Sequence, residues 1–187
     1  MVKVCICLAP GFEECEALVP TDFLRRAGAE VTLAAVGTPD LFVEAAHKVT
    51  VKADAMFDAV QNNAFDAIIC PGGMPGTKNL AKHAPLIAAL KKQAAAGKIV
   101  AAICAAPGFV FAEAAQLLKG KRACGYPGTD DLISKYGGQK LEDPVVVDGN
   151  IITSRGPGTA YLFALAIIKA LFDQATADKV ASGALVK

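Results

Sequence analysis

The sequence predicts an α/β fold in a single domain spanning residues 1–187, with a mostly parallel sheet and helices on both faces. Short apolar runs alternate along the chain with helical segments of about ten to sixteen residues, which is typical of parallel sheets. These runs are apolar throughout rather than alternately apolar and polar, which indicates strands buried on both faces. No repeat, low-complexity tract or long linker divides the chain, which is long enough to bury about 70% of its unfolded surface.

The first half of the chain follows this alternation. The apolar run 2–8 predicts a strand, and 14–27 predicts a helix that Gly28 closes and Pro20 bends or restarts. A second strand is expected at 30–36, followed by a small antiparallel excursion at 42–43 and 49–51. The run 67–70 is a short buried strand that ends at Pro71-Gly72-Gly73, and helices are expected at 76–82 and 86–96, the second beginning at Pro85.

The second half continues the pattern. Residues 98–103 predict a buried strand, and the segment 109–118 after it has helical spacing. Asp148-Gly149-Asn150 lies between two apolar runs and predicts a hairpin over 145–153. The remaining elements are a strand near 122–124 and helices at 130–136, 157–172 and 175–183.

Charge and composition exclude several classes of function. Nineteen basic and eighteen acidic side chains leave a net charge of +1, and no basic run exceeds two residues. This balance shows neither a nucleic-acid footprint nor a polybasic membrane patch, and it is compatible with self-association. The apolar run at the start of the chain is too short to span a membrane and lacks a small-residue cleavage site, so no membrane partner is expected.

The six cysteines are scattered, and no CxxC motif is present. We expect Cys5 and Cys7, the only close pair, to point to opposite faces of their strand and therefore not to bind one ion together. With only His47 and His83 available as imidazole ligands, neither a metal nor another cofactor is expected. The cysteines at positions 5, 7, 70 and 124 are interpreted as core residues, and the expected compartment is the reducing cytoplasm.

Cys104 lies where a buried strand turns sharply into a helix. A side chain at such an elbow projects from the carboxyl edge of the sheet on a strained backbone. The amides of the following helix point toward it, so we expect its thiolate form to be favoured. The alternative is a small buried hydrophobic residue, but carboxyl edges are where open sheets place their chemistry, so Cys104 is the candidate nucleophile.

Two further loops leave neighbouring strands at the same edge. The Gly72-Gly73 turn presents backbone amides without side chains, and with the amide of Ala105 it could form an oxyanion hole, although an ordinary turn would look the same. Glu16, in the loop leaving the first strand, is expected to reach the thiol and to titrate abnormally. Glu13 and Glu14 are interpreted as carboxylates that favour the start of the helix.

Together these segments resemble the ThiJ/PfpI superfamily, in its parkinsonism-associated (DJ-one) deglycase and glyoxalase branch. The resemblance covers nearly the whole chain. It is carried by Gly11-Phe12-Glu13-Glu14-Cys15-Glu16-Ala17, Arg25-Arg26-Ala27-Gly28, Pro71-Gly72-Gly73, Ala102-Ile103-Cys104-Ala105-Ala106-Pro107, Thr153-Ser154-Arg155-Gly156-Pro157-Gly158-Thr159 and Phe163-Ala164-Leu165-Ala166-Ile167.

The resemblance implies a flavodoxin-like three-layer sandwich and a homodimer. By the same resemblance, Cys104 would be an easily oxidised nucleophile, Glu16 its protonated partner, Gly73 and Ala105 the oxyanion amides, and Cys15 a possible interface residue. The family's activities are conversion of methylglyoxal to lactate without glutathione, removal of early glycation adducts from proteins, and oxidative-stress sensing or chaperoning. The partners would be a small aldehyde or a glycated protein.

One position departs from the family pattern: Tyr126 stands before Pro127, where relatives carry a histidine. His47 lies where relatives carry an arginine that reaches the partner subunit, and neither histidine is expected at Cys104. A cysteine peptidase or amidotransferase, which needs such a base, is therefore disfavoured. Arg155 could pair with a carboxylate near the site or cap a loop. The expected function is a glyoxalase or deglycase, with a redox sensor or chaperone homodimer using the same cysteine as the alternative.

Overall fold

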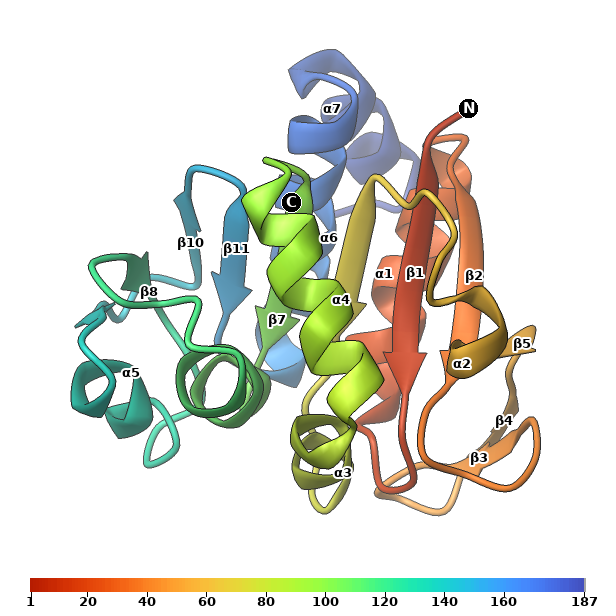
Figure 1. Ribbon diagram of the computed structural model, residues 1–187. Helices are drawn as coiled ribbons and strands as arrows, with labels where there is room; N and C mark the ends of the chain where they lie inside the picture. Colours follow the sequence, from red (N-terminus) through yellow and green to blue (C-terminus); the bar gives the residue numbers. More distant parts are fainter. Residues whose placement is uncertain (187) are drawn as a thin grey trace.

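A computed structural model describes residues 1–186 of the chain. Its centre is a seven-stranded sheet in the order β10-β11-β7-β6-β1-β2-β5, parallel except for β10, which pairs antiparallel with β11 (Figure 1). The strands of this sheet are β1 (Lys3–Leu8), β2 (Glu30–Ala35), β5 (Ala55–Met56), β6 (Ala67–Cys70), β7 (Ile99–Ile103), β10 (Val145–Asp148) and β11 (Ile151–Ser154).

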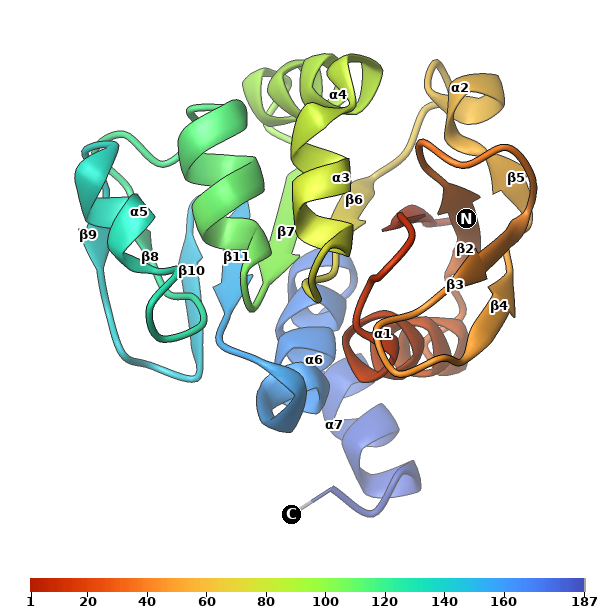
Figure 2. The ribbon, with the colours of Figure 1, turned by 90° about the horizontal axis from the view of Figure 1, so that it is seen from below.

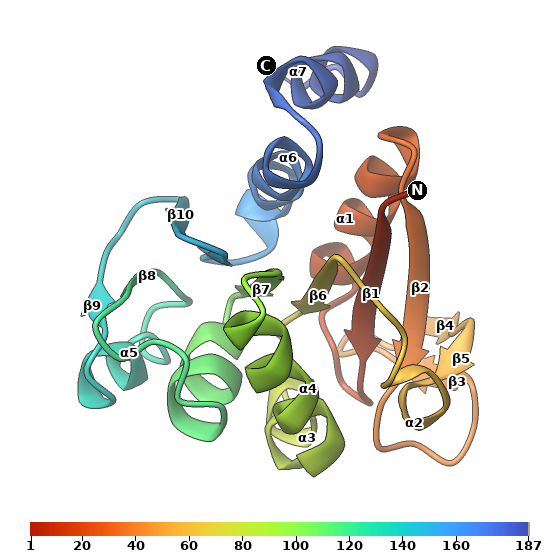
Figure 3. The same ribbon diagram turned by 45° about the horizontal axis from the view of Figure 1, so that its top comes forward.

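Helices cover both faces of the sheet, giving three layers (Figure 2). One outer layer holds α1 (Glu14–Arg26), α6 (Ala160–Leu171) and α7 (Gln174–Gly183), which also stack on one another in Figure 3. The other layer is made of the segments between β5 and β11: α2 (Phe57–Val60), α3 (Gly76–Lys82), α4 (Ala84–Ala95), the helix η1 (Pro107–Ala114) and α5 (Asp131–Lys135). The predicted α/β architecture is confirmed.

The two faces of β1 belong to different cores. Val4, Ile6 and Leu8 pack toward α1 and α6, whereas Cys5 and Cys7 both pack toward the α3–α4 side. The expectation that the two cysteines point to opposite faces was wrong, because residues two apart on a strand share a face. The interpretation of the cysteines at positions 5, 7, 70 and 124 as core residues is confirmed, since all four are fully buried.

Some elements differ from the sequence prediction. The segment after β7 is a π-helix rather than an α-helix, and the helix expected from residue 157 starts as a single 3₁₀ turn, η2 (Pro157–Thr159). The excursion is a separate hairpin of β3 (Phe42–Glu44) and β4 (Thr50–Lys52), as predicted. The short elements β5 and α2 were not predicted. Another short strand, β9 (Gln139–Lys140), was also missed, and it pairs in parallel with β8 (Arg122–Ala123).

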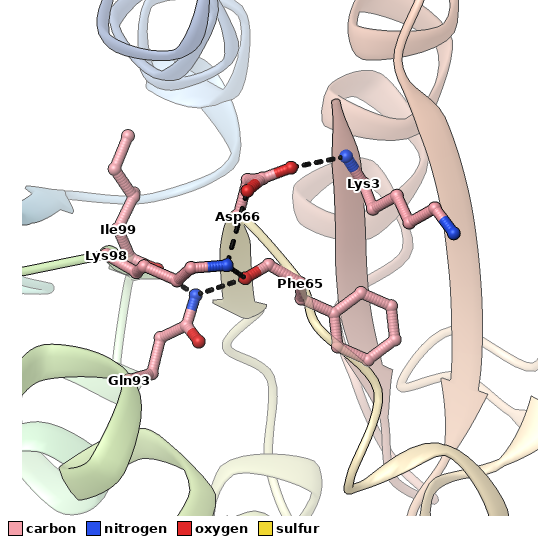
Figure 4. A network of polar contacts seen from close by, with 6 residues as sticks. All are labelled: Lys3, Phe65, Asp66, Gln93, Lys98 and Ile99. Atoms are coloured by element: carbon pink, nitrogen blue, oxygen red, sulfur yellow. Dashed lines mark hydrogen bonds and ion pairs between the residues drawn. The ribbon is translucent and has the colours of Figure 1, made fainter. Parts of the chain in front are cut away.

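A polar network ties together the amino ends of β1, β6 and β7 (Figure 4). The carbonyl of Phe65 accepts hydrogen bonds from the Gln93 amide of α4 at 3.1 Å and from the Lys98 ammonium at 2.7 Å. Asp66 accepts from the backbone amide of Lys3 and lies 3.3 Å from the Lys98 nitrogen. The carboxyl ends of the same strands meet at the opposite edge, where the candidate site lies (Figure 1).

Candidate active site

Cys104 occupies the turn between β7 and η1 with a strained backbone. Its φ of +66° lies in the left-handed region that residues with a Cβ rarely adopt. The backbone amide of Cys104 donates to the carbonyl of Ser154, and its carbonyl accepts from the amide of Tyr126 at 2.7 Å. These bonds anchor the elbow to β11 on one side and to the loop after β8 on the other, and the positive φ of Cys104 agrees with the predicted strain.

Glu16 comes to the site from the first turn of α1. Glu13 is the N-cap of this helix and accepts from the Glu16 backbone amide at 2.7 Å, so the chain enters the helix with the Glu16 side chain turned inward. The Glu16 side chain is fully buried, and its Oε2 accepts from the Gly72 amide at 2.8 Å. Its Oε1 is buried without a hydrogen-bond partner in residues 1–186, a suitable position for a carboxyl proton.

Gly72 packs against both the Cys104 thiol and the Glu16 carboxyl. A Cβ built at this position would come within 2.6 Å of both the Cys104 Cβ and the Glu16 Oε2, and within 3.0 Å of the Cys104 sulfur. No other residue fits here without displacing the thiol or the carboxyl. The expected proximity of Glu16 to Cys104 is therefore present in the structure.

The loops after β1 and β6 pack backbone against backbone. A Cβ on Gly73 would lie 2.4 Å from the amide nitrogen of Glu13, and one on Gly76 would lie 2.5 Å from that of Phe12. The Glu13 amide donates to the Gly72 carbonyl at 2.9 Å, and the Gly76 amide donates to the Gly11 carbonyl. Sequence reasoning missed this interlock, although the glycine spacing in both loops was a signal for it.

The two titratable groups affect each other strongly. Burial raises the pKa of Glu16 to about 7, while hydrogen bonds from Cys104 and the Gly72 amide oppose that rise. Burial, followed by the charge of Glu16, raises the pKa of Cys104 to about 12, and the amides of Gly73 and Ala105 oppose that rise. Contrary to the expectation, the thiol pKa is raised and not lowered. At pH values between about 7 and about 12, the Cys104–Glu16 pair carries one negative charge.

Three further candidate residues, Tyr126, Arg155 and His47, make different contacts. The backbone of Tyr126 contacts that of Cys104, and its half-exposed ring lies beside Gly156. Arg155 donates to the carbonyl of Glu142 at 3.0 Å, so it caps a loop. His47 is exposed and lies 3.0 Å from the Glu14 carboxylate, which raises the pKa of its imidazole.

Neither histidine can serve Cys104 as a base in this arrangement. His83 uses one ring nitrogen to cap α4 and the other to contact Asp58 at 3.3 Å. Within residues 1–186, one set of possible metal ligands has its atoms within 4.8 Å of one another, namely Glu13, Glu14 and His47. Because Glu13 already caps α1 and Glu14 already pairs with His47, we assign no metal to it.

Comparison with known proteins places this geometry in a family. The sequence model of the DJ-1/PfpI family matches residues 2–170. Protein DJ-1 homolog B of Arabidopsis thaliana is 42% identical over 98% of this chain, which spans only 41% of that protein. The glutathione-independent glyoxalase DJR-1.2 of Caenorhabditis elegans is 38% identical over 85% of this chain and 82% of its own length.

A solved structure confirms the flavodoxin-like sandwich. The crystal structure of Drosophila melanogaster DJ-1beta superposes with a TM-score of 0.94 at 35% identity, covering 100% of this chain and 98% of the other. No helix in residues 1–186 is long and apolar enough to cross a membrane. Both the sequence match and the superposition extend over the segments that carry Glu16, Gly72 and Cys104. The chain therefore belongs to the DJ-1/PfpI family, within its DJ-1 branch.

Proposed function

We propose that this protein is a glutathione-independent glyoxalase that converts methylglyoxal to lactate and also acts on the early adducts of methylglyoxal with proteins. The observation that carries the proposal is the buried Glu16 carboxyl packed against Cys104, with the amides of Gly73 and Ala105 directed at the sulfur. One nucleophile, one proton carrier and two fixed donors are the groups that this isomerisation requires.

The first step is attack of the thiolate on the aldehyde. The Cys104 proton passes to Glu16, the sulfur bonds to the aldehyde carbon, and the former carbonyl oxygen becomes an oxyanion near the amides of Gly73 and Ala105. Glu16 then returns its proton to that oxygen, giving a hemithioacetal and a carboxylate. Donors fixed in a buried site stabilise such an oxyanion without reorganising.

The second step moves a hydrogen between the two carbons. The Glu16 carboxylate removes the proton from the former aldehyde carbon, and the electron pair moves to the ketone oxygen to form an enediolate. Glu16 then delivers its proton to the neighbouring carbon, while the hydroxyl proton on the former aldehyde carbon passes to the enolate oxygen. The product is a thioester of lactate, which water cleaves to release lactate and restore the thiol. A carboxyl with a pKa of about 7 suits this task, because it can both accept and donate a proton at neutral pH.

Lactate production by purified variants tests the proposal. Cys104→Ala removes the nucleophile and abolishes activity, and Glu16→Gln removes the proton carrier and lowers the rate by about 10²–10⁴-fold. Matched controls are Cys15→Ala, at an exposed thiol, and Glu14→Gln, at a carboxylate that pairs with His47. Both controls keep the wild-type rate. Full activity in Cys104→Ala would refute the assignment.

The alternative, a redox sensor or chaperone, uses the same contacts. Amides directed at the Cys104 sulfur, with a buried carboxyl beside it, would also hydrogen-bond the oxygens of a sulfinate. Peptide mass spectrometry after mild peroxide treatment distinguishes the two functions. Addition of two oxygens at Cys104 in a protein that makes no lactate supports the sensor and contradicts the glyoxalase. A peptidase is disfavoured because both histidines are engaged elsewhere.

The protein is also proposed to act as a homodimer in the reducing cytoplasm. All six cysteines are free, and α1 exposes Cys15 and Leu18 beside the hairpin that carries His47. An exposed apolar side chain on a helix next to the site offers a contact for a second copy. Light scattering should give twice the chain mass of 19.2 kDa, and a value of one chain mass would refute the dimer.

A further inference from the structure

Three thiols form a buried row beneath the candidate site. Cys5 and Cys7 of β1 and Cys70 of β6 all belong to the core on the α3–α4 side of the sheet, and all three are fully buried. The Cys7 thiol interacts with both of the others. Cys104 belongs to the other core, and Cys124 is hydrogen-bonded to Thr153. The row is therefore separate from the nucleophile.

Cys7 and Cys70 are neighbours on the adjacent strands β1 and β6 and lie on the same face of the sheet. The parallel register pairs Ile6 with Ile69, so the next residue of each strand stands opposite the other. Neighbouring strands lie about 4.7–4.9 Å apart, which falls within the Cα separation of about 4.4–6.8 Å found in disulfides. Cys5 stands opposite Ile68 instead, which leaves Cys7 and Cys70 as the matched pair.

We propose that Cys7 and Cys70 are a latent disulfide pair, and that peroxide joins them as a second oxidation site behind Cys104. Hydrogen peroxide oxidises one thiol to a sulfenic acid and releases water. The second thiol then attacks that sulfur, the S–S bond forms, and another water leaves. Two thiols are oxidised and one peroxide is reduced, so no further reactant is needed.

The environment of the pair sets the order of oxidation. Neither thiol is exposed, whereas Cys104 is 8% exposed at the carboxyl edge. Peroxide therefore reaches Cys7 and Cys70 only when β1 and β6 open locally, and Cys104 is consumed first. Cys7 and Cys70 lie just before the Gly11–Glu16 and Pro71–Gly76 loops, so the new bond would link the two strands that carry half of the site.

The test uses the whole chain of residues 1–187 and increasing hydrogen peroxide. After each dose, the protein is unfolded, its free thiols are counted and alkylated, and tryptic peptides are analysed by mass spectrometry. In Cys15→Ala, which lacks the exposed thiol, we expect the count to fall from five to four as Cys104 is oxidised and then to two. The last loss should coincide with a cross-link between the peptides of residues 4–25 and 53–78. Cys124, equally buried but without a thiol neighbour, stays reduced.

Variants identify the bond, since the first peptide contains Cys5, Cys7 and Cys15. Cys5→Ala and Cys15→Ala keep the cross-link, whereas Cys7→Ala and Cys70→Ala lose it. Urea below the unfolding transition speeds its formation several-fold in wild type, because it promotes local opening. Absence of the cross-link after complete oxidation of Cys104, with and without this urea, overturns the proposal. A cross-link that survives in Cys7→Ala also overturns it.

Discussion

At pH 7 about half of the molecules carry one negative charge on the Cys104–Glu16 pair, and at higher pH nearly all do, because the pKa of Glu16 is about 7 and that of Cys104 about 12. The charge can sit on either group, since a proton moves between contacting atoms without leaving the pair. The fraction of molecules that hold this charge rises as pH rises through about 7 and is then constant. Thiolate reactivity must follow that fraction.

This gives a pH prediction for Cys104. Its alkylation by iodoacetamide, measured on the Cys104 peptide, rises with an inflection near pH 7 and then levels off. Glu16→Gln removes the group that titrates there, so the inflection disappears and the rate keeps rising into alkaline solution. The Cys104 pKa in that variant lies below 12, because the carboxylate charge is gone, but burial keeps it above the ordinary value. An unchanged inflection in Glu16→Gln would contradict the shared proton.

Gly72 gives a steric prediction at the same scale. In Gly72→Ala the new methyl group would approach the Cys104 Cβ and the Glu16 Oε2 to 2.6 Å, so one of them must move. A displacement of about 1 Å lowers lactate production by about 10²-fold, and overpacking costs about 1–3 kcal/mol of stability. Gly158→Ala is the control, since nothing lies within 4 Å of its Cβ. Comparable loss in both variants would show that the crowding at position 72 is not the cause.

At the scale of elements, structures that depend on adjacent residues could be predicted from the sequence, and those that depend on pairing with distant strands could not. The start of α4 beside Pro85 and the β10–β11 hairpin around Gly149 depend on a few adjacent residues. The hairpin was predicted, and the helix start was predicted to within one residue, since α4 begins at Ala84. The strands β5 and β9 have only two residues each and exist because a neighbouring strand pairs with them. The π-helix η1 has the same apolar spacing as an α-helix, so its extra residue per turn could not be predicted.

The site divides in the same way. Cys104, Gly73 and Ala105 could be placed because they follow strands that end at one edge of a parallel sheet, and Glu16 because it begins the helix after another such strand. Tyr126, Arg155 and His47 were uncertain because their position depends on how separate loops fold back. The shared face of Cys5 and Cys7 was also predictable, because residues two apart on a strand point to the same side. The expectation of opposite faces applied the strand period wrongly.

The amino-edge network allows a prediction for an element. Gln93 of α4 is almost fully buried and donates to the carbonyls of Phe65 and Ile99 (Figure 4). Gln93→Leu removes both donors, so the free energy of unfolding in urea falls by about 1–3 kcal/mol. Lactate production by the folded variant stays at the wild-type rate, since the network lies at the edge opposite Cys104. The exposed Gln174→Leu should shift stability by less than about 0.5 kcal/mol, and an equal effect would contradict the role of Gln93.

For the whole molecule, the buried carboxyl makes stability depend on pH. The pKa of Glu16 rises from an ordinary value of 4.5 in the unfolded chain to about 7 in the folded protein. The folded state therefore binds the proton more tightly. This stabilising contribution is complete below pH 4.5 and is lost as pH rises through 7, by up to about 3 kcal/mol.

Urea unfolding of wild type and Glu16→Gln at pH 5 and pH 8 measures this contribution. Other groups titrate in both proteins, so only the difference between them is informative. Wild type should lose up to about 3 kcal/mol relative to the variant between the two pH values. If the two proteins lose equal stability, Glu16 is not protonated on folding.

The interlocked loops at Gly11–Phe12 and Gly73–Gly76 restrict how this protein could be engineered. Because backbone atoms fill the space on that side, a larger aldehyde cannot be admitted by trimming side chains there. The half-exposed ring of Tyr126 lies beside Gly156, and the backbone amide of Tyr126 contacts Cys104, so these two positions can be changed without disturbing that interlock. A library built to broaden the range of accepted aldehydes should vary those two positions and leave the glycine loops untouched.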